Sequence, residues 1–144
     1  YCRVHQWLRT DKKPKELKKR TLIKSVKTPD FGFQTQLQVF RHVYFITRKP
    51  VRCMLSGQDL TDCMNAPITV WVSYFAHILN KKNHTYWRLN PANIRIISPI
   101  AHGIIDNGTL KDREQYPTWN WDLWDQLVEE KKKEYTLFVK ENNL

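Results

Sequence analysis

Residues 114–125 read EQYPTWNWDLWD, a stretch that holds four aromatic rings, one proline and three carboxylates. Pro117 fixes its own φ and holds Tyr116 in an extended conformation, so this pair predicts a rigid entry to the element that follows. Thr118 is then the expected N-cap of a helix. Downstream, apolar residues recur at helical spacing and predict a helix with one buried face. They are Trp124, Leu127, Val128, Tyr135 and Phe138.

The aromatic rings of this stretch have two interpretations. In the first they form a docking surface, because rigid aromatic side chains bury much area at a low cost in entropy and dominate macromolecular contacts. The docking residues would be Tyr116, Pro117, Trp119, Trp121 and Trp124. In the second they fill this chain's own core, where large aromatic residues usually lie. The sequence leaves both interpretations open.

The net charge of +10 is concentrated at the start of the chain. Residues 1–52 hold 14 Lys and Arg and 3 acidic residues, a net charge of +11, whereas residues 53–144 hold 10 and 11, a net charge of −1. We expect residues 1–30 to form an extended basic arm, because their few apolar side chains cannot bury enough area to fold alone. Residues 31–144 are the length of one small domain.

Clustered Lys and Arg are typical of a surface that binds nucleic-acid phosphates, because each contact releases condensed counterions. The candidate RNA-binding residues of the arm are Lys12, Lys13, Lys15, Lys18, Lys19, Arg20, Lys24 and Lys27. A second, compact basic loop around Pro50 adds Arg48, Lys49 and Arg52. The alternative for the arm is a solvated tail or the remainder of a basic targeting segment. A membrane-surface role is less favoured, because the arm has no aromatic cluster.

The remainder of the chain predicts an α+β fold, a small mixed domain of a few strands and two or more helices. Residues 33–47 alternate apolar and polar side chains and are rich in aromatic and β-branched residues, which predicts a strand. Residues 94–97 predict a second, short and buried strand. Turns are expected near Gly57 and at Asn107, which precedes a glycine.

A helix is expected to begin at Asn65, with this residue as its cap and Pro67 in its first turn, and to run to about Lys81. The apolar residues that support it lie at i, i+4, i+7 and i+8. They are Trp71, Phe75, Ile78 and Leu79. The run 68–72 is equally suited to a strand, because it is rich in β-branched residues.

The residues that usually carry catalysis or bind metals do not converge in this sequence. The three cysteines (Cys2, Cys53 and Cys63) form no Cys-x-x-Cys pair, so we expect them to be reduced and structural. The five histidines show no ligand spacing, and His77 is interpreted as a hydrogen-bonded core residue. There is no glycine-rich phosphate loop and no Gly-x-Ser-x-Gly motif. We therefore expect a protein that is not an enzyme and that has no catalytic residues, cofactor, metal site or small-molecule substrate. No apolar run approaches the length of a membrane span.

A family resemblance rests on residues 114–125. Its signature residues are Glu114, Tyr116, Pro117, Trp119, Trp121, Leu123 and Asp125. In order and spacing they resemble the Glu-x-Tyr-Pro-x-Trp-x-Trp-x-Leu-x-Asp signature of mitochondrial large-ribosomal-subunit protein family fifty-four. The likeness covers about a dozen residues. It implies a structural component of the large subunit of the mitochondrial ribosome, located in the matrix and bound to rRNA and to neighbouring ribosomal proteins.

Two other readings of the sequence remain open. One is a non-catalytic accessory subunit of another mitochondrial assembly, such as a respiratory complex, with the basic arm against lipid headgroups. The other is a secreted glycosylated domain, because Asn83 and Asn107 each begin an Asn-x-Thr acceptor motif. The odd number of cysteines and the lysine-rich arm argue against secretion.

Overall fold

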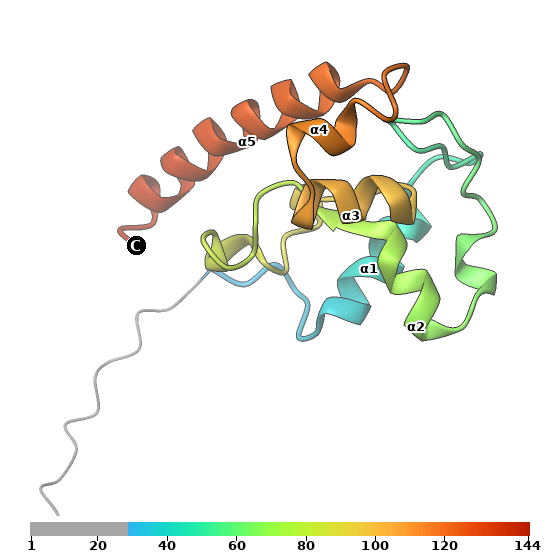
Figure 1. Ribbon diagram of the computed structural model, residues 1–144. Coiled ribbons are helices and arrows are strands. Elements are labelled where there is room, and N and C mark those ends of the chain that lie inside the picture. Colours follow the sequence, from blue (N-terminus) through green and yellow to red (C-terminus); the bar gives the residue numbers. More distant parts are fainter. Residues whose placement is uncertain (1–28) are drawn as a thin grey trace, which may run out of the picture.

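The computed structural model describes residues 29–144, which form the small α+β domain expected from the sequence (Figure 1). Most of the expected basic arm, residues 1–28, lies outside the described residues. The helices and strands, in chain order, are α1 (Gln36–Ile46), η2 (Cys63–Asn65), α2 (Ile68–Trp71), η3 (Val72–Tyr74), β1 (Phe75–His77), η4 (Thr85–Trp87), η5 (Pro91–Asn93), β2 (Ile94–Ile96), α3 (Pro99–Asn107), α4 (Leu110–Arg113) and α5 (Trp121–Glu141), where η denotes a 3₁₀-helix.

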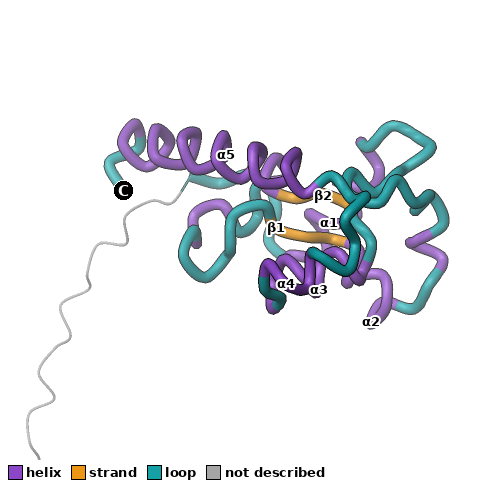
Figure 2. The backbone as a smooth tube through the Cα atoms, turned by 45° about the horizontal axis from the view of Figure 1, so that its top comes forward, coloured by secondary structure: helices purple, strands orange, loops and turns teal. Residues whose placement is uncertain are grey.

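Strands β1 and β2 form a two-stranded antiparallel sheet in which Phe75 pairs with Ile96. Figure 2 shows the two strands near the middle of the molecule. The pairing continues beyond the strands, since the Ile97 N–H donates to the Tyr74 carbonyl over 2.8 Å. The prediction of a short buried strand at 94–97 is therefore confirmed.

One buried amide fixes the chain just before β2. Asn93 has no exposed surface. Its Oδ1 accepts from the Leu79 N–H over 2.8 Å, and its Nδ2 donates to the carbonyls of Leu79 and Trp87 over 3.2 and 3.4 Å. Because a buried backbone group without a partner is costly, these bonds hold the 79–93 loop against the start of β2.

The strand predicted for residues 33–47 is wrong, because this segment forms α1. Thr35 and Gln38 build a capping box: Thr35 Oγ1 accepts from the Gln38 N–H over 3.3 Å, and Gln38 Oε1 accepts from the Thr35 N–H over 3.2 Å. The buried residues of α1 are Val39, Phe40 and Val43. Their spacing is that of one helix face, and tertiary burial of that face outweighs the β propensity of the individual residues.

The helix predicted from Asn65 to about Lys81 is also wrong in extent. Only α2, four residues long, is α-helical here, and its N-cap is Pro67 rather than Asn65. The chain then passes through η3 into β1. The β-branched run 68–72 is a poor helix former, and the pairing of β1 with β2 satisfies the backbone beyond it.

Helix α3 was not identified from the sequence, although its end signals are present. Ser98 caps it, and Pro99 occupies its first position. The turn expected at the Asn107-Gly108 pair is the C-terminal end of this helix, where the Gly108 N–H donates to the Ile104 carbonyl over 2.9 Å. A Cβ on Gly108 would lie 2.6 Å from that carbonyl oxygen, so the close approach requires glycine.

The expected C-terminal helix is confirmed as α5, which lies along one side of the molecule in Figure 1. Its N-cap is Asn120, whose Oδ1 accepts from the Leu123 N–H over 3.2 Å, so the cap predicted at Thr118 is wrong. The predicted stripe is confirmed as the inner face of the helix. Trp124 is buried, and the partly buried members are Leu127, Val128, Tyr135 and Phe138.

The hydrophobic core gathers side chains from α1, the sheet, α3 and the first turns of α5. Phe40 of α1 stacks on Phe75 of β1 with ring centroids 4.7 Å apart, which joins the helix to the sheet.

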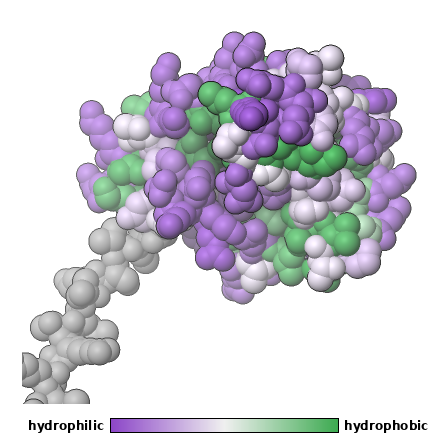
Figure 3. Space-filling view, viewed as in Figure 1, coloured by the Kyte–Doolittle hydropathy of each residue, from purple (hydrophilic) through white to green (hydrophobic). Residues whose placement is uncertain are grey.

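On the face drawn in Figure 3, α5 is mostly hydrophilic and hydrophobic residues show in smaller patches. The partly exposed apolar residues include Ile68, Val70 and Ile100.

Candidate nucleic-acid interface

The C-terminal end of α1 and the loop after it carry a basic surface, which we call the basic corner. It comprises Arg41, Phe45, Arg48, Lys49 and Arg52, all of them exposed. Arg41 and Phe45 are one helical turn apart, so they share a face of α1. Phe45 is 85% exposed, an unusual position for a phenylalanine on a helix that buries other aromatic residues.

The three loop residues expected to bind RNA differ in whether their side chains already form contacts within the domain. The Lys49 ammonium lies 3.5 Å from the centroid of the Tyr44 ring and donates to the Tyr44 and Thr47 carbonyls at the end of α1. It therefore helps to cap the helix, whose C-terminal carbonyls attract a cation. In the part of the chain that the structure describes, no hydrogen bond or ion pair engages the Arg48 guanidinium.

Arg52 is held by the turn that the sequence predicted near Gly57. Its Nη1 donates to the Gly57 carbonyl over 3.3 Å, and its backbone forms an isolated bridge with Asp59. Gly57 has a φ of 75°, a conformation that favours glycine. Hydrogen bonds from Thr61 lower the pKa of Asp59, and the Arg52 charge adds to this. Asp59 is thus a carboxylate that offsets part of the Arg52 charge.

The Trp-rich stretch divides into a buried and a more exposed part. Trp124 and Trp121 are 2% and 9% exposed and belong to this chain's own core, so for them the second interpretation of the sequence holds. The Trp121 indole N–H donates to the Tyr116 carbonyl over 3.0 Å. Arg113 places its guanidinium 4.9 Å from the centroid of the Trp121 ring. These two tryptophans are unavailable to a partner.

Among the predicted docking residues, Tyr116, Pro117 and Trp119 form the more exposed part. The rings of Tyr116 and Trp119 stack with their centroids 4.1 Å apart, and both are partly buried against the core. Pro117 is exposed between them. Only these three of the five predicted docking residues lie where a neighbouring molecule can reach them.

Phe45 was not expected from the sequence to be a site residue. Within a strand of alternating pattern it would have pointed into the core together with Val43 and Leu37. A helical reading of residues 36–46 places Phe45 about 200° from Val43 around the axis, so the helical wheel was the signal that identifies it.

The cysteines that the structure describes are free and buried. Burial works to raise the pKa of the Cys53 thiol, but hydrogen bonds from Ser56 and from the Ser98 N–H outweigh it, and the pKa is lowered. Burial raises the pKa of Cys63. Because Cys53 is only 2% exposed, its sulfur serves as a hydrogen-bond acceptor within the core rather than as an accessible nucleophile.

Two histidines are fixed by backbone carbonyls. His77 Nε2 donates to the Arg88 carbonyl over 3.0 Å, which agrees with its interpretation as a hydrogen-bonded residue, although it lies on β1 rather than on a helix. Burial lowers the pKa of His77. His102 bonds the Ser73 carbonyl over 2.6 Å through Nδ1 and Asp106 over 2.9 Å through Nε2.

Within residues 29–144, no nucleophilic side chain contacts the imidazole of this Asp–His pair. The neighbouring Ser73 hydroxyl donates to the Val70 carbonyl over 2.6 Å, and it is the Ser73 backbone, not its Oγ, that His102 contacts. A serine nucleophile would need its Oγ within hydrogen-bond reach of the imidazole. Among residues 29–144 no group of three or more His, Cys, Asp or Glu side chains is placed to hold a metal ion.

Comparison of the chain with protein-family models, with curated proteins and with solved structures gave no match. Within residues 29–144, no helix combines the length and the apolar character that crossing a membrane requires.

Proposed function

We propose that this chain is a non-catalytic structural protein that binds rRNA in the large subunit of the mitochondrial ribosome. The observation that carries the proposal is the separation of charge along the chain. Residues 1–28 hold 10 Lys and Arg and 2 acidic residues, a net charge of +8, whereas the described residues 29–144 hold 14 and 12, a net charge of +2. A strongly basic segment joined to a nearly neutral domain suits an electrostatic contact with a polyanion.

The basic corner supports this proposal from within the folded domain. It adds exposed guanidinium groups to a surface next to an exposed aromatic ring. Arginine matches the geometry of phosphate oxygens, and aromatic side chains accept unstacked RNA bases. Phosphate contacts of this kind fix the position of a protein and carry no sequence information, which suits a structural component.

The mitochondrial and ribosomal parts of the proposal rest on the resemblance of residues 114–125 to family fifty-four. In this proposal, Tyr116, Pro117 and Trp119 contact a neighbouring ribosomal protein or an rRNA surface, while Trp121 and Trp124 hold the stretch in place from the core. The stacked Tyr116 and Trp119 rings are pre-organised for such a contact, because little side-chain entropy remains to be lost.

The direct test is sedimentation of the tagged full chain from cell extract on a sucrose gradient, with sequencing of the RNA in the fractions that contain it. The proposal predicts co-migration with the large ribosomal subunit and enrichment of mitochondrial large-subunit rRNA. Migration in a complex free of RNA would contradict it and favour an accessory subunit of another assembly.

A second test measures the salt dependence of RNA binding by the purified chain. Replacing Arg48 and Arg52 with Gln should weaken binding about tenfold at 0.1 M salt and lower the slope of log K against log salt by about 0.7–0.9 per lost phosphate contact. The matched control replaces Arg88 and Lys111 with Gln, which removes the same charge from exposed positions elsewhere. Equal effects of the two pairs would mean that net charge alone drives binding. Binding to anionic liposomes but not to RNA would exclude the proposal.

A further inference from the structure

An apolar groove of about 490 Å³ opens beside the basic corner, between the end of α1 and strand β2. Its walls are mainly aliphatic: Val43, Ile46, Val51, Met54, Ile94 and Ile96. Ile46 is 58% exposed, although it lies at the end of a helix whose inner face is buried. The volume falls within the range of pockets that hold small ligands or single groups of larger ones.

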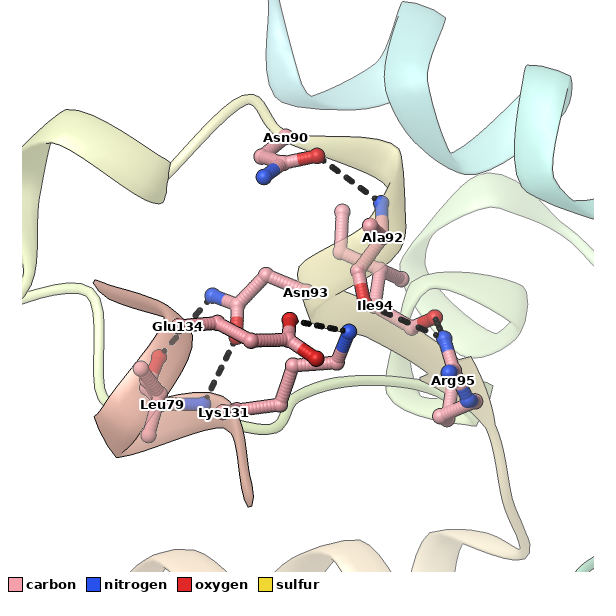
Figure 4. Close-up of polar contacts among 8 residues, drawn as sticks. All are labelled: Leu79, Asn90, Ala92, Asn93, Ile94, Arg95, Lys131 and Glu134. Atoms are coloured by element: carbon pink, nitrogen blue, oxygen red, sulfur yellow. Dashed lines mark hydrogen bonds and ion pairs between the residues drawn. The ribbon is translucent and has the colours of Figure 1, made fainter. Parts of the chain in front are cut away.

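Two arginines, Arg52 and Arg95, also line this groove. Figure 4 shows Arg95 donating through one nitrogen to the carbonyls of Ala92 and Ile94, over 3.2 and 2.9 Å. In the same view the Glu134 carboxylate is paired instead with Lys131, over 2.9 Å. No carboxylate among residues 29–144 forms an ion pair with the Arg95 guanidinium.

Burial lowers the pKa of Arg95, because the guanidinium has lost part of its hydration, and the charge of Glu134 offsets this only in part. A half-buried cation of this kind, without a paired carboxylate in the described domain, gains from an anion that reaches it. Arg52, which belongs to the basic corner, supplies a second cation to the same groove. An apolar floor between two cations is complementary to a ligand that has a flat apolar part and a negatively charged part.

The outer edge of β2 adds hydrogen-bonding groups to the groove. Hydrogen-bonded and non-hydrogen-bonded pairs alternate in an antiparallel ladder. Since Ile97 bonds Tyr74 across the sheet, the neighbouring Ile96 turns its N–H and C=O away from β1, toward the edge where the described chain places no third strand. An N–H beside a C=O is the donor and acceptor pattern that can read the edge of a base.

We propose that this groove takes one unpaired nucleotide of RNA, with the base between the aliphatic walls and its phosphates on Arg52 and Arg95. The inference rests on the proposed function and specifies it. It assigns to the folded domain a preference for single-stranded over double-stranded RNA, because only an unstacked base can enter the groove.

A peptide strand is the competing occupant, and the geometry of β2 disfavours it. Strand addition depends on several consecutive backbone hydrogen bonds along a free edge. β2 has three residues, and the Ile94 carbonyl on its outer edge is already bonded to Arg95. Within the described domain the N–H and C=O of Ile96 have no hydrogen-bond partner, and this single pair suits a compact group better than an extended chain.

The test compares the full chain with a variant in which the groove is filled. Ala92 lines the groove and is exposed, so Ala92→Trp occupies the space of the base without replacing a core residue. The control is Asn83→Trp, which adds the same side chain at an exposed position outside the groove. The probes are a 12-nucleotide single-stranded oligouridine, a double-stranded RNA with the same number of phosphates, and uridine monophosphate. Thermal unfolding of each variant verifies that it is folded.

We expect Ala92→Trp to weaken binding of the single strand about tenfold, the equivalent of one lost base contact, and to leave duplex binding unchanged. Asn83→Trp should change neither. Competition by uridine monophosphate in the millimolar range would identify the base and phosphate themselves as the recognised group. Arg95→Gln should produce the same selective loss as Ala92→Trp, whereas Arg88→Gln should not.

Three results would overturn the inference in distinguishable ways. Equal affinity for single and double strands, unaffected by Ala92→Trp, would exclude the groove while the proposed RNA-binding function stood. Failure of the full chain to bind any RNA would exclude both. Binding of an alternating Leu-Asp peptide that is weakened by Ala92→Trp, together with no RNA binding, would assign the groove to a peptide.

Discussion

The sequence indicates two short segments as candidate binding surfaces, residues 114–125 and the basic loop 48–52, and the structure places their side chains in opposite environments. Residues 114–125 place two of their three tryptophans, Trp121 and Trp124, in the domain's own core. The basic loop instead exposes Arg48, Lys49 and Arg52. The contrast shows that a high density of aromatic residues predicts a large buried area. It does not predict whether that area is buried within the chain or against a partner.

The physical reason lies in what each side chain loses when it leaves water. A tryptophan gains free energy from burial in either setting, so its sequence context is ambiguous. An arginine that is buried without a partner loses far more than it gains, so a cluster of basic residues must remain at the surface or meet an anion. Charge therefore predicted the exposure of the basic loop correctly, whereas aromatic composition left the burial of the Trp-rich stretch ambiguous.

The largest effect expected from this comparison is that of Trp124→Ala. Trp124 is 2% exposed, so its loss should lower the free energy of unfolding by about 3–5 kcal/mol through lost burial and the cavity left behind. Urea unfolding followed by circular dichroism measures it. Leu123→Ala is the control, because Leu123 is 42% exposed on the same turn of α5 and should lose much less. Comparable stability of the Trp124→Ala and wild-type chains would mean that Trp124 is a docking residue after all.

A smaller effect separates the two halves of the Trp-rich stretch. Trp121→Phe removes the N–H that donates to the Tyr116 carbonyl and should lower the free energy of unfolding by about 1–2 kcal/mol. Trp119→Phe makes the same chemical change in a partly buried ring for which the described structure records no such bond, and should lower it by less than about 0.5 kcal/mol. Thermal unfolding of both variants distinguishes them. A larger loss for Trp119→Phe would reverse the assignment of buried and exposed parts.

The same contrast explains how much of the fold the sequence could predict. The long stripe of α5 and the compact aliphatic run of β2 were identified because a whole segment repeats one period. Residues 33–47 were misread as a strand, since composition favoured β structure while the deciding signals, the Thr35–Gln38 box and the buried face, were local and few. The helix predicted to Lys81 failed because the pairing of β1 with β2 joins residues about 20 apart in the chain.

The candidate site follows the same rule. The exposure of Arg48, Lys49 and Arg52 could be predicted, because charge determines it locally. Arg95 could not be placed in the same groove as Arg52, 43 residues earlier in the sequence, because that groove exists only where α1 packs near β2. Tertiary packing of this kind leaves no periodic signal for a sequence argument to find.

The buried region should also respond to pH in a way that the basic corner does not. The pKa of His77 is lowered by burial, so below about pH 6.5 the unfolded chain takes up a proton more readily than the folded one. The stability that neutral His77 contributes above about pH 6.5 should be lost as the pH falls toward the lower pKa that His77 has in the folded chain. Urea unfolding at pH 7.5, 6.5 and 5.5 measures the decline. His77→Gln keeps a donor for the Arg88 carbonyl but cannot titrate, so its decline should be shallower. Identical slopes would exclude His77 as the cause.

The smallest effect on stability is expected at Phe45, and it tests the exposed side of the comparison. Phe40 and Phe45 lie on one helix, but Phe40 is 2% exposed and stacked on Phe75, whereas Phe45 is 85% exposed. Phe40→Ala should cost about 3–5 kcal/mol and Phe45→Ala less than about 0.5 kcal/mol. Thermal unfolding of the two variants measures this difference.

If Phe45 serves in binding, its replacement should lower the affinity for RNA rather than the free energy of unfolding. Phe45→Ala should then weaken binding of single-stranded RNA several-fold, because an exposed ring beside arginines can stack a base. Arg41→Gln, one turn earlier on the same face, should weaken it too. Phe45→Ala should leave unfolding unaltered, whereas Arg41→Gln also removes a guanidinium 5.9 Å from the centroid of the Trp71 ring and should lower the free energy of unfolding by up to about 1 kcal/mol. A Phe45→Ala variant that loses stability would show that the ring packs within the domain. One that loses neither stability nor affinity would confine RNA contact at the basic corner to its charges.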